Sequence, residues 1–261
     1  MRYCVLISCW LLTTAALAQQ TYAVIVGVST YQHGSARPQG NQIQNLNFSD
    51  DDARRFYQFL RSPAGGSVPT TQMHLITNEH ASRTNLLRAL KLFRRAGAND
   101  RVIFYFSGHG APGFFVPFDA TPDGRANLLT HAELKEAFRA SAARTKLCLA
   151  DACHAGSIRR PTPAAEGTPA GALDQTSVVV FMSARANEYS LERGTLRQGV
   201  FSYFLIKGLS GMADRNRDRR VSAYELYAYV RQNVQQQTQG RQTPIAYGRF
   251  SKELPLAQVA P

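Results

Sequence analysis

Runs of apolar residues alternate along the chain with segments in which apolar residues recur every three or four positions. The runs are rich in β-branched residues and predict strands buried on both faces, whereas the periodic segments are typical of amphipathic helices. Thr130 and Glu133 form a capping box at one helix start. Strands are expected at 21–28, 73–77, 101–106, 146–150 and 177–182, and helices at 50–61, 83–95, 130–140, 199–209 and 223–235.

Strands that alternate with helices predict an α/β fold, with a mostly parallel central sheet and helices on both faces. The chain has 261 residues, enough for one full hydrophobic core, and no internal repeat divides it. We therefore expect a single domain over residues 19–255, followed by a tail at 256–261. In such sheets ligands bind at the carboxyl ends of the strands, so reactive residues are sought there.

The N-terminus differs from the rest of the chain. Arg2 precedes an apolar stretch from Val5 to Leu17, and Ala16 and Ala18 form a small-residue cleavage pattern before Gln19. This order predicts a signal peptide over residues 1–18 and an exported protein, periplasmic or secreted. The stretch is short for a bilayer span, and no later segment is longer, so no stable membrane span is expected; an uncleaved N-terminal anchor is the alternative.

The formal net charge is +12, which attracts anionic polymers such as nucleic acid or envelope glycan. No basic run interleaves with aromatic residues, so the charge favours a solvated surface over a specific nucleic-acid site. Cys4 and Cys9 would leave with the signal peptide. The two remaining cysteines, Cys148 and Cys153, are held apart by an expected strand, which disfavours a disulfide between them.

Two reactive residues follow the ends of two expected strands. RVIFYF runs into His109, and TKLCLA runs into Asp151 and Cys153. If the two strands are neighbours, the imidazole and the thiol face each other, which is the nucleophile and base pair needed for acyl transfer. Cys148 lies inside the strand and is expected to be a core thiol. A zinc site from these residues and His154 has no supporting ligand spacing.

Several of these segments together resemble one family. "FYFSGHG", "LADACHAG", "YAVIVGVSTY", "DDARRFYQFL" and "GVFSYFLIKGL" are similar to the caspase-like cysteine peptidases, the metacaspase and bacterial branch in particular. The resemblance covers most of the chain from about Tyr22 to Leu209. It implies a caspase-like fold and a peptidase that requires no cofactor.

The resemblance also implies roles for single residues. Cys153 matches the family's nucleophile and His109 its general base, and the backbone N–H groups of Gly110 and Cys153 would bind the oxyanion. Asp151 stands two residues before the nucleophile, where caspases that cleave after acidic residues have Gln. Asp52 and Ser107 join Asp151 in lining the pocket for the residue before the scissile bond, and two carboxylates there should select Arg or Lys. Read without the family, Asp52 is a helix N-terminal charge and Asp151 a strand-end cap.

Residues 157–176 are rich in Pro, Gly, Ala and Thr and predict a long mobile loop. Family members are often cut in this region. A peptidase specific for basic residues could cut its own loop between Arg159 and Arg160, because Pro161 disfavours cleavage after Arg160. The alternative is a solvated dibasic loop.

A further pattern lies near the C-terminus. Asp214, Asn216, Asp218 and Glu225 fall at positions 1, 3, 5 and 12 of an EF-hand loop. Arg219 stands where that loop needs glycine, and four arginines within the loop repel a divalent cation. The pattern favours a degenerate loop at the start of the last helix over a calcium site, so calcium is possible but not expected to be required.

These observations predict an exported cysteine endopeptidase that cleaves after Arg or Lys through a Cys153/His109 dyad. Its expected partner is a protein or peptide substrate with basic residues, and no feature predicts an oligomeric state. The main alternative is a non-catalytic binding module on the same scaffold that recognises basic peptides or calcium. A basic protein that binds envelope or nucleic acid is a third class, and its binding would survive loss of Cys153.

Overall fold

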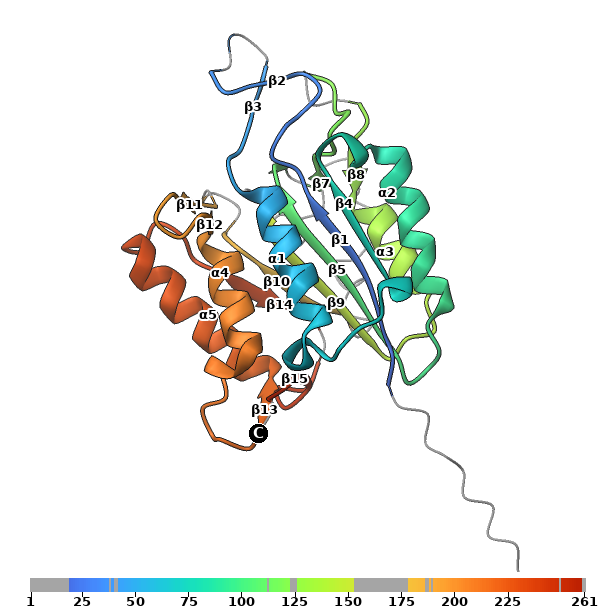
Figure 1. Cartoon of the computed structure of the whole chain (residues 1–261), viewed down its shortest axis with the longest axis vertical. Helices are drawn as coiled ribbons and strands as arrows, with labels where there is room; N and C mark the ends of the chain where they lie inside the picture. The colour runs from blue at the N-terminus through green and yellow to red at the C-terminus, as the bar shows by residue number, and fades with distance from the viewer. Residues whose placement is uncertain are drawn as a thin grey trace, which may run out of the picture.

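The computed structural model describes residues 19–259 except 38, 40–41, 112, 123–125, 153–177, 186–187, 189 and 249. A six-stranded sheet runs through the molecule in the order β14-β10-β9-β5-β1-β4 (Figure 1). Its strands are β1 (Thr21–Gly27), β4 (Met73–Thr77), β5 (Arg101–Gly108), β9 (Thr145–Ala152), β10 (Val178–Met182) and β14 (Ile245–Tyr247). All neighbours are parallel except β10 and β14, which confirms the mostly parallel sheet.

Helices cover both faces of this sheet, as predicted. One face packs against α1 (Ser49–Arg61), α4 (Val200–Lys207) and α5 (Ala223–Thr238), and the other against α2 (Arg83–Leu90) and α3 (His131–Arg139). Successive strand residues point to opposite faces, so Ala23 and Ile25 belong to the first core while Val24 and Val26 belong to the second. This division explains why the strands read as continuous apolar runs.

The expected helices differ from the observed ones mainly at their ends. The segment expected as one helix over 83–95 ends as α-helix at Leu90 and continues as the 3₁₀ helix η4 (Lys91–Arg95). The segment 199–209 becomes α4 followed by η7 (Gly208–Met212), a π-type turn in which Gly211 has a φ of 113°. The capping box of Thr130 and Glu133 forms as predicted at the start of α3.

Short strands that the hydrophobic pattern did not predict surround the main sheet. They form four small sheets from β2 (Gly34–Ser35), β3 (Ile43–Gln44), β6 (Gly110–Ala111), β7 (Phe114–Phe115), β8 (Leu129–Thr130), β11 (Glu192–Arg193), β12 (Gln198–Gly199), β13 (Arg220–Ser222) and β15 (Pro255–Gln258). The residues expected to form a tail from 256 onward therefore begin as a strand instead. Leu256 is buried in the core and β15 pairs with β13, so residues 255–258 pack with the domain.

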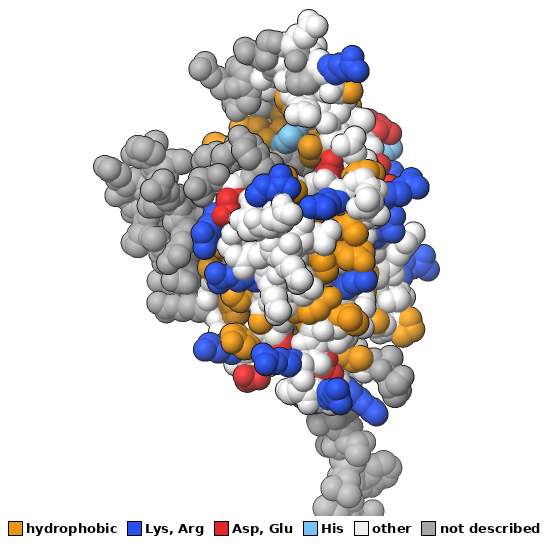
Figure 2. All heavy atoms as spheres, turned by 90° about the vertical axis from the view of Figure 1, so that its left-hand side faces the viewer, with side chains coloured by type: hydrophobic (Ala, Val, Ile, Leu, Met, Phe, Trp, Pro, Cys, Tyr) orange, Lys and Arg blue, Asp and Glu red, His pale blue; other side chains and the backbone are white. Residues whose placement is uncertain are grey.

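The surface carries its basic side chains in a dispersed arrangement. On the face that presents α4 and α5, Figure 2 shows Lys and Arg side chains separated by polar and apolar surface, with no single dense patch. Within the part of the chain that the structure describes, no helix is both long and apolar enough to cross a membrane.

Candidate active site

The candidate site is built on the adjacent parallel strands β5 and β9, which confirms that the two strands are neighbours. Ser107 pairs with Asp151, and Gly108 pairs with Ala152. His109 follows β5 directly. Cys153 follows β9 directly but lies outside the described residues, so only its approach through Ala152 is observed.

His109 is held on three sides. Its ring Nε2 lies 2.6 Å from the carbonyl oxygen of Gln44 in β3, its backbone N–H donates to the Tyr31 hydroxyl at 2.8 Å, and its ring lies 5.2 Å from the Tyr31 ring. A carbonyl oxygen can only accept, so the proton of the neutral imidazole lies on Nε2. Nδ1 therefore keeps its lone pair and is the ring atom able to take a proton.

Burial also lowers the pKa of His109, because the charged imidazolium is poorly solvated. The Gln44 carbonyl and the charge of Glu192 act in the opposite direction and offset part of this effect. The neutral imidazole is thus favoured at neutral pH, the state that a general base requires.

Cys148, the cysteine that lies among the described residues, is not part of this site. Cys148 lies inside β9 and is 2% exposed, and burial raises the pKa of its thiol to about 12. A thiol with so high a pKa forms almost no thiolate at neutral pH, so Cys148 is a core residue, as predicted.

Ser183 fixes the backbone that leads to Cys153. Its hydroxyl is fully buried just after β10, accepts from the N–H of Ala152 at 3.1 Å and lies 3.2 Å from the Ala152 carbonyl. A single side chain therefore satisfies both polar groups of the residue before the expected nucleophile.

A buried carboxyl cluster lies beside these residues. Asp52 of α1 is 1% exposed and Asp151 of β9 is 5% exposed. Ser107 donates to Asp52 at 3.0 Å, so the structure brings together all three residues expected to line the substrate pocket. No Lys or Arg of the described chain forms an ion pair with either carboxyl.

Both carboxyls also face the N-terminus of α4. The N–H of Gly199 donates to the two oxygens of Asp52 at 3.1 Å, and Ser202 donates to Asp151 through its N–H at 3.0 Å and its hydroxyl at 2.7 Å. Ser190 adds a hydrogen bond to Asp151. These donors, together with the positive end of the helix dipole, partly compensate two buried negative charges.

Only glycine fits at position 199, because the carboxyls of Asp52 and Asp151 lie close to its backbone. A Cβ there would come within 2.9 Å of Asp52 Oδ2 and closer still to Asp151 Oδ2. Both oxygens thus surround one backbone position, and any larger residue would force them away.

The pKa values of both acids are raised. Burial is the main cause for each, and repulsion from Asp151 raises the pKa of Asp52 further. Glu192 of β11 adds a third negative charge that acts on both. It is positioned by the backbone N–H groups of Asn47 and Phe48, to which its carboxylate accepts hydrogen bonds of 2.9 and 2.8 Å. A cationic side chain placed here would meet concentrated, poorly solvated negative charge.

A comparison with protein families now gives this arrangement a context. The model of the caspase domain family matches residues 20–255, nearly the whole described chain. The chain belongs to the caspase-domain family. A caspase domain is a cysteine peptidase domain, in agreement with the resemblance seen in the sequence.

Two relatives support the assignment. A probable protease from a Desulfuromonadales bacterium is 26% identical over 157 residues, a match that takes in 51% of this chain but only 18% of that protease. Caspase-1 from Spodoptera frugiperda has the same fold, with a TM-score of 0.62 over 92% of this chain and 91% of the insect chain at 12% identity.

Other predicted residues of this caspase domain are placed less fully. Gly110 lies in β6 beside His109 and pairs with Phe115 of β7. Cys153, His154, Arg159 and Arg160 lie outside the described residues, as does the whole expected loop at 157–176. The oxyanion site and the self-cleavage site therefore stay predictions.

The EF-hand-like loop of the caspase domain turns its oxygens inward. Asp214 accepts from the N–H of Arg219 at 3.0 Å, Asn216 and Asp218 bond each other, and Glu225 accepts from Ser222 in a capping box at the start of α5. Within the described chain, no group of three or more His, Cys, Asp or Glu side chains is arranged to hold a metal. Asp214 Oδ1 is buried and has no hydrogen-bond partner among the described residues, so the expectation that calcium is not required stays a prediction.

Several residues of the site were not found from the sequence. Their contacts are made by backbone groups or across the fold, so the sequence gives them no role, even where they lie inside a quoted segment: Tyr31, Gln44, Ser183, Ser190, Glu192, Gly199 and Ser202. A weak signal was present only in "QGVFSYF", where a glycine directly before a helix start marks a close approach.

Proposed function

We propose that this caspase domain is an exported cysteine endopeptidase that cleaves peptide bonds after Arg or Lys, with Cys153 as nucleophile and His109 as general base. The observation that carries the specificity is the buried pair Asp52 and Asp151, which has no basic partner in the described chain. The orientation of His109, whose Nε2 is bonded to Gln44 so that Nδ1 keeps its lone pair, supports the role as base.

The proposed reaction uses the Cys153 thiol and the His109 imidazole. His109 Nδ1 takes the thiol proton, and the Cys153 sulfur attacks the substrate carbonyl carbon. Backbone N–H groups of Gly110 and Cys153 would stabilise the oxyanion. When the C–N bond breaks, the imidazolium gives its proton to the leaving amine. A water molecule, deprotonated by His109, then hydrolyses the thioester, which releases the carboxylate product and restores the thiol.

Specificity arises from charge. A guanidinium or ammonium group next to Asp52 and Asp151 would relieve their mutual repulsion and the cost of burying them. An acidic side chain in the same place would add a further like charge at a cost of several kcal/mol. Ser107 and Ser190 would act as neutral hydrogen-bonding walls of the pocket.

The deciding experiment compares purified protein from Gln19 onward with its Cys153→Ala variant. Both are assayed under reducing conditions on matched fluorogenic peptides that end in Arg, Lys or Asp. Turnover of the Arg and Lys peptides, absent with Asp and lost in the variant, is the expected result. If no peptide is cleaved while labelled basic peptide still binds, the protein is a recognition module on a peptidase scaffold.

A separate experiment tests export and self-cleavage. N-terminal sequencing of the protein from the culture medium and from cell fractions should give Gln19 as the first residue. A second N-terminus at Arg160 is expected only when Cys153 is intact and Arg159 has not been changed to Ala. Secretion with an uncleaved N-terminus would contradict the signal peptide.

A further inference from the structure

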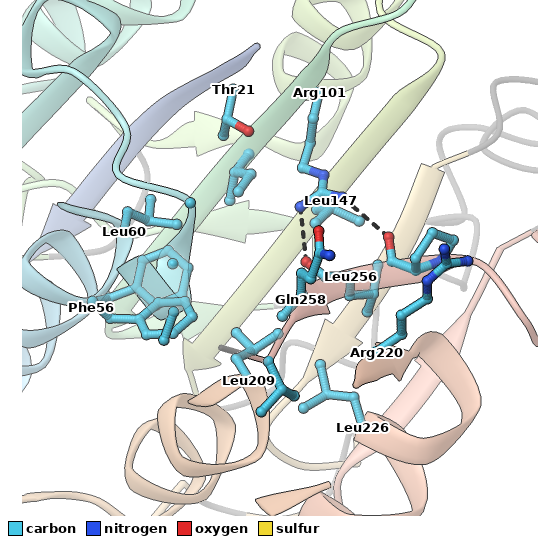
Figure 3. Close-up of a pocket in the computed structure, with 18 of the residues that line it drawn as sticks. Thr21, Phe56, Leu60, Arg101, Leu147, Leu209, Arg220, Leu226, Leu256 and Gln258 are labelled. Carbon is cyan, nitrogen blue, oxygen red and sulfur yellow. Dashed lines mark hydrogen bonds between the residues drawn. The ribbon is translucent and has the colours of Figure 1, made fainter. Parts of the chain in front are cut away.

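A cavity of about 670 Å³ lies at the end of the sheet opposite the candidate active site. Its volume is within the usual range for small-molecule sites. Most of its wall is apolar, and its lining residues include Phe56 and Leu60 of α1, Leu147 of β9, Leu209 of η7, Leu226 of α5 and Leu256 of β15 (Figure 3). None of the described residues that line it is acidic.

One end of this cavity carries an arginine without a counter-charge. Arg101 begins β5, and its two terminal nitrogens donate to the carbonyl oxygens of Leu256 at 2.8 Å and Pro255 at 3.1 Å. Its Nε is buried and has no hydrogen-bond partner among the described residues, and no Asp or Glu of that part of the chain forms an ion pair with it. Burial lowers the pKa of Arg101 to about 10, which leaves it charged at neutral pH.

Arg101 is half-buried with its Nε fully covered, and removing part of a guanidinium from water is costly unless an anion meets it. Arg101 has five N–H donors, of which the two carbonyls occupy only part, and a carboxylate is the group that such a planar fork binds best. A second cation, Arg220, also lines the cavity. The cavity therefore combines an apolar body with a positive end, which matches a ligand with one negative head group and an apolar chain.

We propose that this cavity binds a monocarboxylate with an unbranched apolar chain, such as a medium-chain fatty acid, with its head group at Arg101 and its chain against Phe56, Leu209 and Leu226. Arg101 and Gly108 are the two ends of β5, so the head group would lie roughly 25 Å from the end of the strand that carries His109. The site is thus separate from the peptidase centre and does not depend on the proposed specificity.

Gln258 offers a sharp test. It is an exposed residue of β15, lines the cavity and extends toward Arg101 in Figure 3. Gln258→Glu would place a carboxylate of the protein itself where the ligand head group binds. Gln232→Glu makes the same change at an exposed position of α5 that does not line the cavity and serves as the matched control.

Binding is measured by titration calorimetry with decanoate, decanol, decyl phosphate and decyltrimethylammonium on the protein from Gln19 onward. Decanoate should bind at least about tenfold more tightly than decanol, and the cation should not bind. Gln258→Glu should weaken decanoate at least about tenfold, leave decanol unchanged and raise the Tm, while Gln232→Glu changes nothing.

Three results would overturn the proposal. Equal affinity for decanoate and decanol would remove the role of Arg101. Unchanged decanoate binding in Gln258→Glu would place the ligand elsewhere. Decyl phosphate binding tenfold tighter than decanoate would assign the cavity to phosphate-headed lipids instead.

Discussion

Asp52 is almost entirely removed from water, although it carries a carboxyl group and its strongest charged neighbour is a second carboxyl, Asp151. Hydrogen bonds from Ser107 and Gly199 satisfy its oxygens but bring no positive charge except the helix end. In a folded protein without substrate, this pair is destabilising relative to a neutral one. Such a cost close to the end of β5 that carries His109 is typical of residues kept for binding rather than for stability.

Asp52→Asn should separate the proposed role of Asp52 in substrate binding from its effect on stability. The amide keeps the size and one acceptor but removes the charge, so kcat/KM for an Arg peptide should fall about a hundredfold or more while the Tm stays equal or rises. Steady-state kinetics and thermal unfolding measure the two effects. Asp51→Asn, one residue earlier on α1 and without a partner in the cluster, is the matched control and should change neither.

The pH dependence of stability tests the same pair in another way. The folded pKa values of Asp52 and Asp151 lie above the unfolded value of 3.8, so the folded state binds protons more tightly. The stability that this provides is complete below pH 3.8 and is lost as the pH rises through the raised folded values. The Tm of the wild type should therefore fall relative to that of Asp52→Asn as the pH rises from about 4 to about 8. Parallel Tm profiles would show that the carboxyls are not electrostatically strained.

At the scale of elements, the site depends on how β9 and β10 hold the segment before Cys153. Ser183→Ala removes the hydroxyl that satisfies both polar groups of Ala152, at a cost of about 1–3 kcal/mol for buried groups left unpaired. Because the nucleophile follows directly, kcat should fall more than KM rises. Ser141→Ala, at a buried serine after α3 whose hydroxyl also accepts a backbone N–H, should lower the Tm without a change in kcat.

The main elements could be predicted because buried positions recur at regular spacings along the sequence. Continuous apolar runs gave β1, β4, β5, β9 and β10, and the three-and-four spacing gave the five helices, with errors at their ends where α-helix changes to 3₁₀ or π geometry. The short strands could not be predicted in this way. Two- and three-residue segments such as β3 and β15 form only because the rest of the fold brings their partners close.

The candidate site likewise has parts that the sequence predicts and parts that it does not. His109 and the acids Asp52 and Asp151 stand at the ends of elements and were recognisable as site residues. The contacts that orient them come from backbone groups of Gln44 and Gly199, which no side-chain motif encodes. The sequence therefore offered candidate reacting groups, whose roles stay predictions, but not the groups that fix the tautomer of His109 and the surroundings of the two acids.

At the scale of the whole molecule, the remaining question is whether a metal controls the domain. The loop from Asp214 to Glu225 carries four arginines, and its carboxylates accept hydrogen bonds from the loop itself and from Ser222. A calcium ion would have to break these bonds and approach a net positive segment. Peptidase activity and Tm should therefore be the same in excess EGTA and in millimolar calcium.

Asp214→Asn provides the control for that experiment. Asp214 accepts the N–H of Arg219, whose φ of 66° is unusual for a residue with a side chain, so the variant should lower the Tm slightly with or without calcium. If calcium raised the Tm of the wild type but not of Asp214→Asn, the loop would be a metal site despite its arginines. A rise in both proteins would instead locate calcium elsewhere in the chain, because the change at Asp214 would not have touched its ligands.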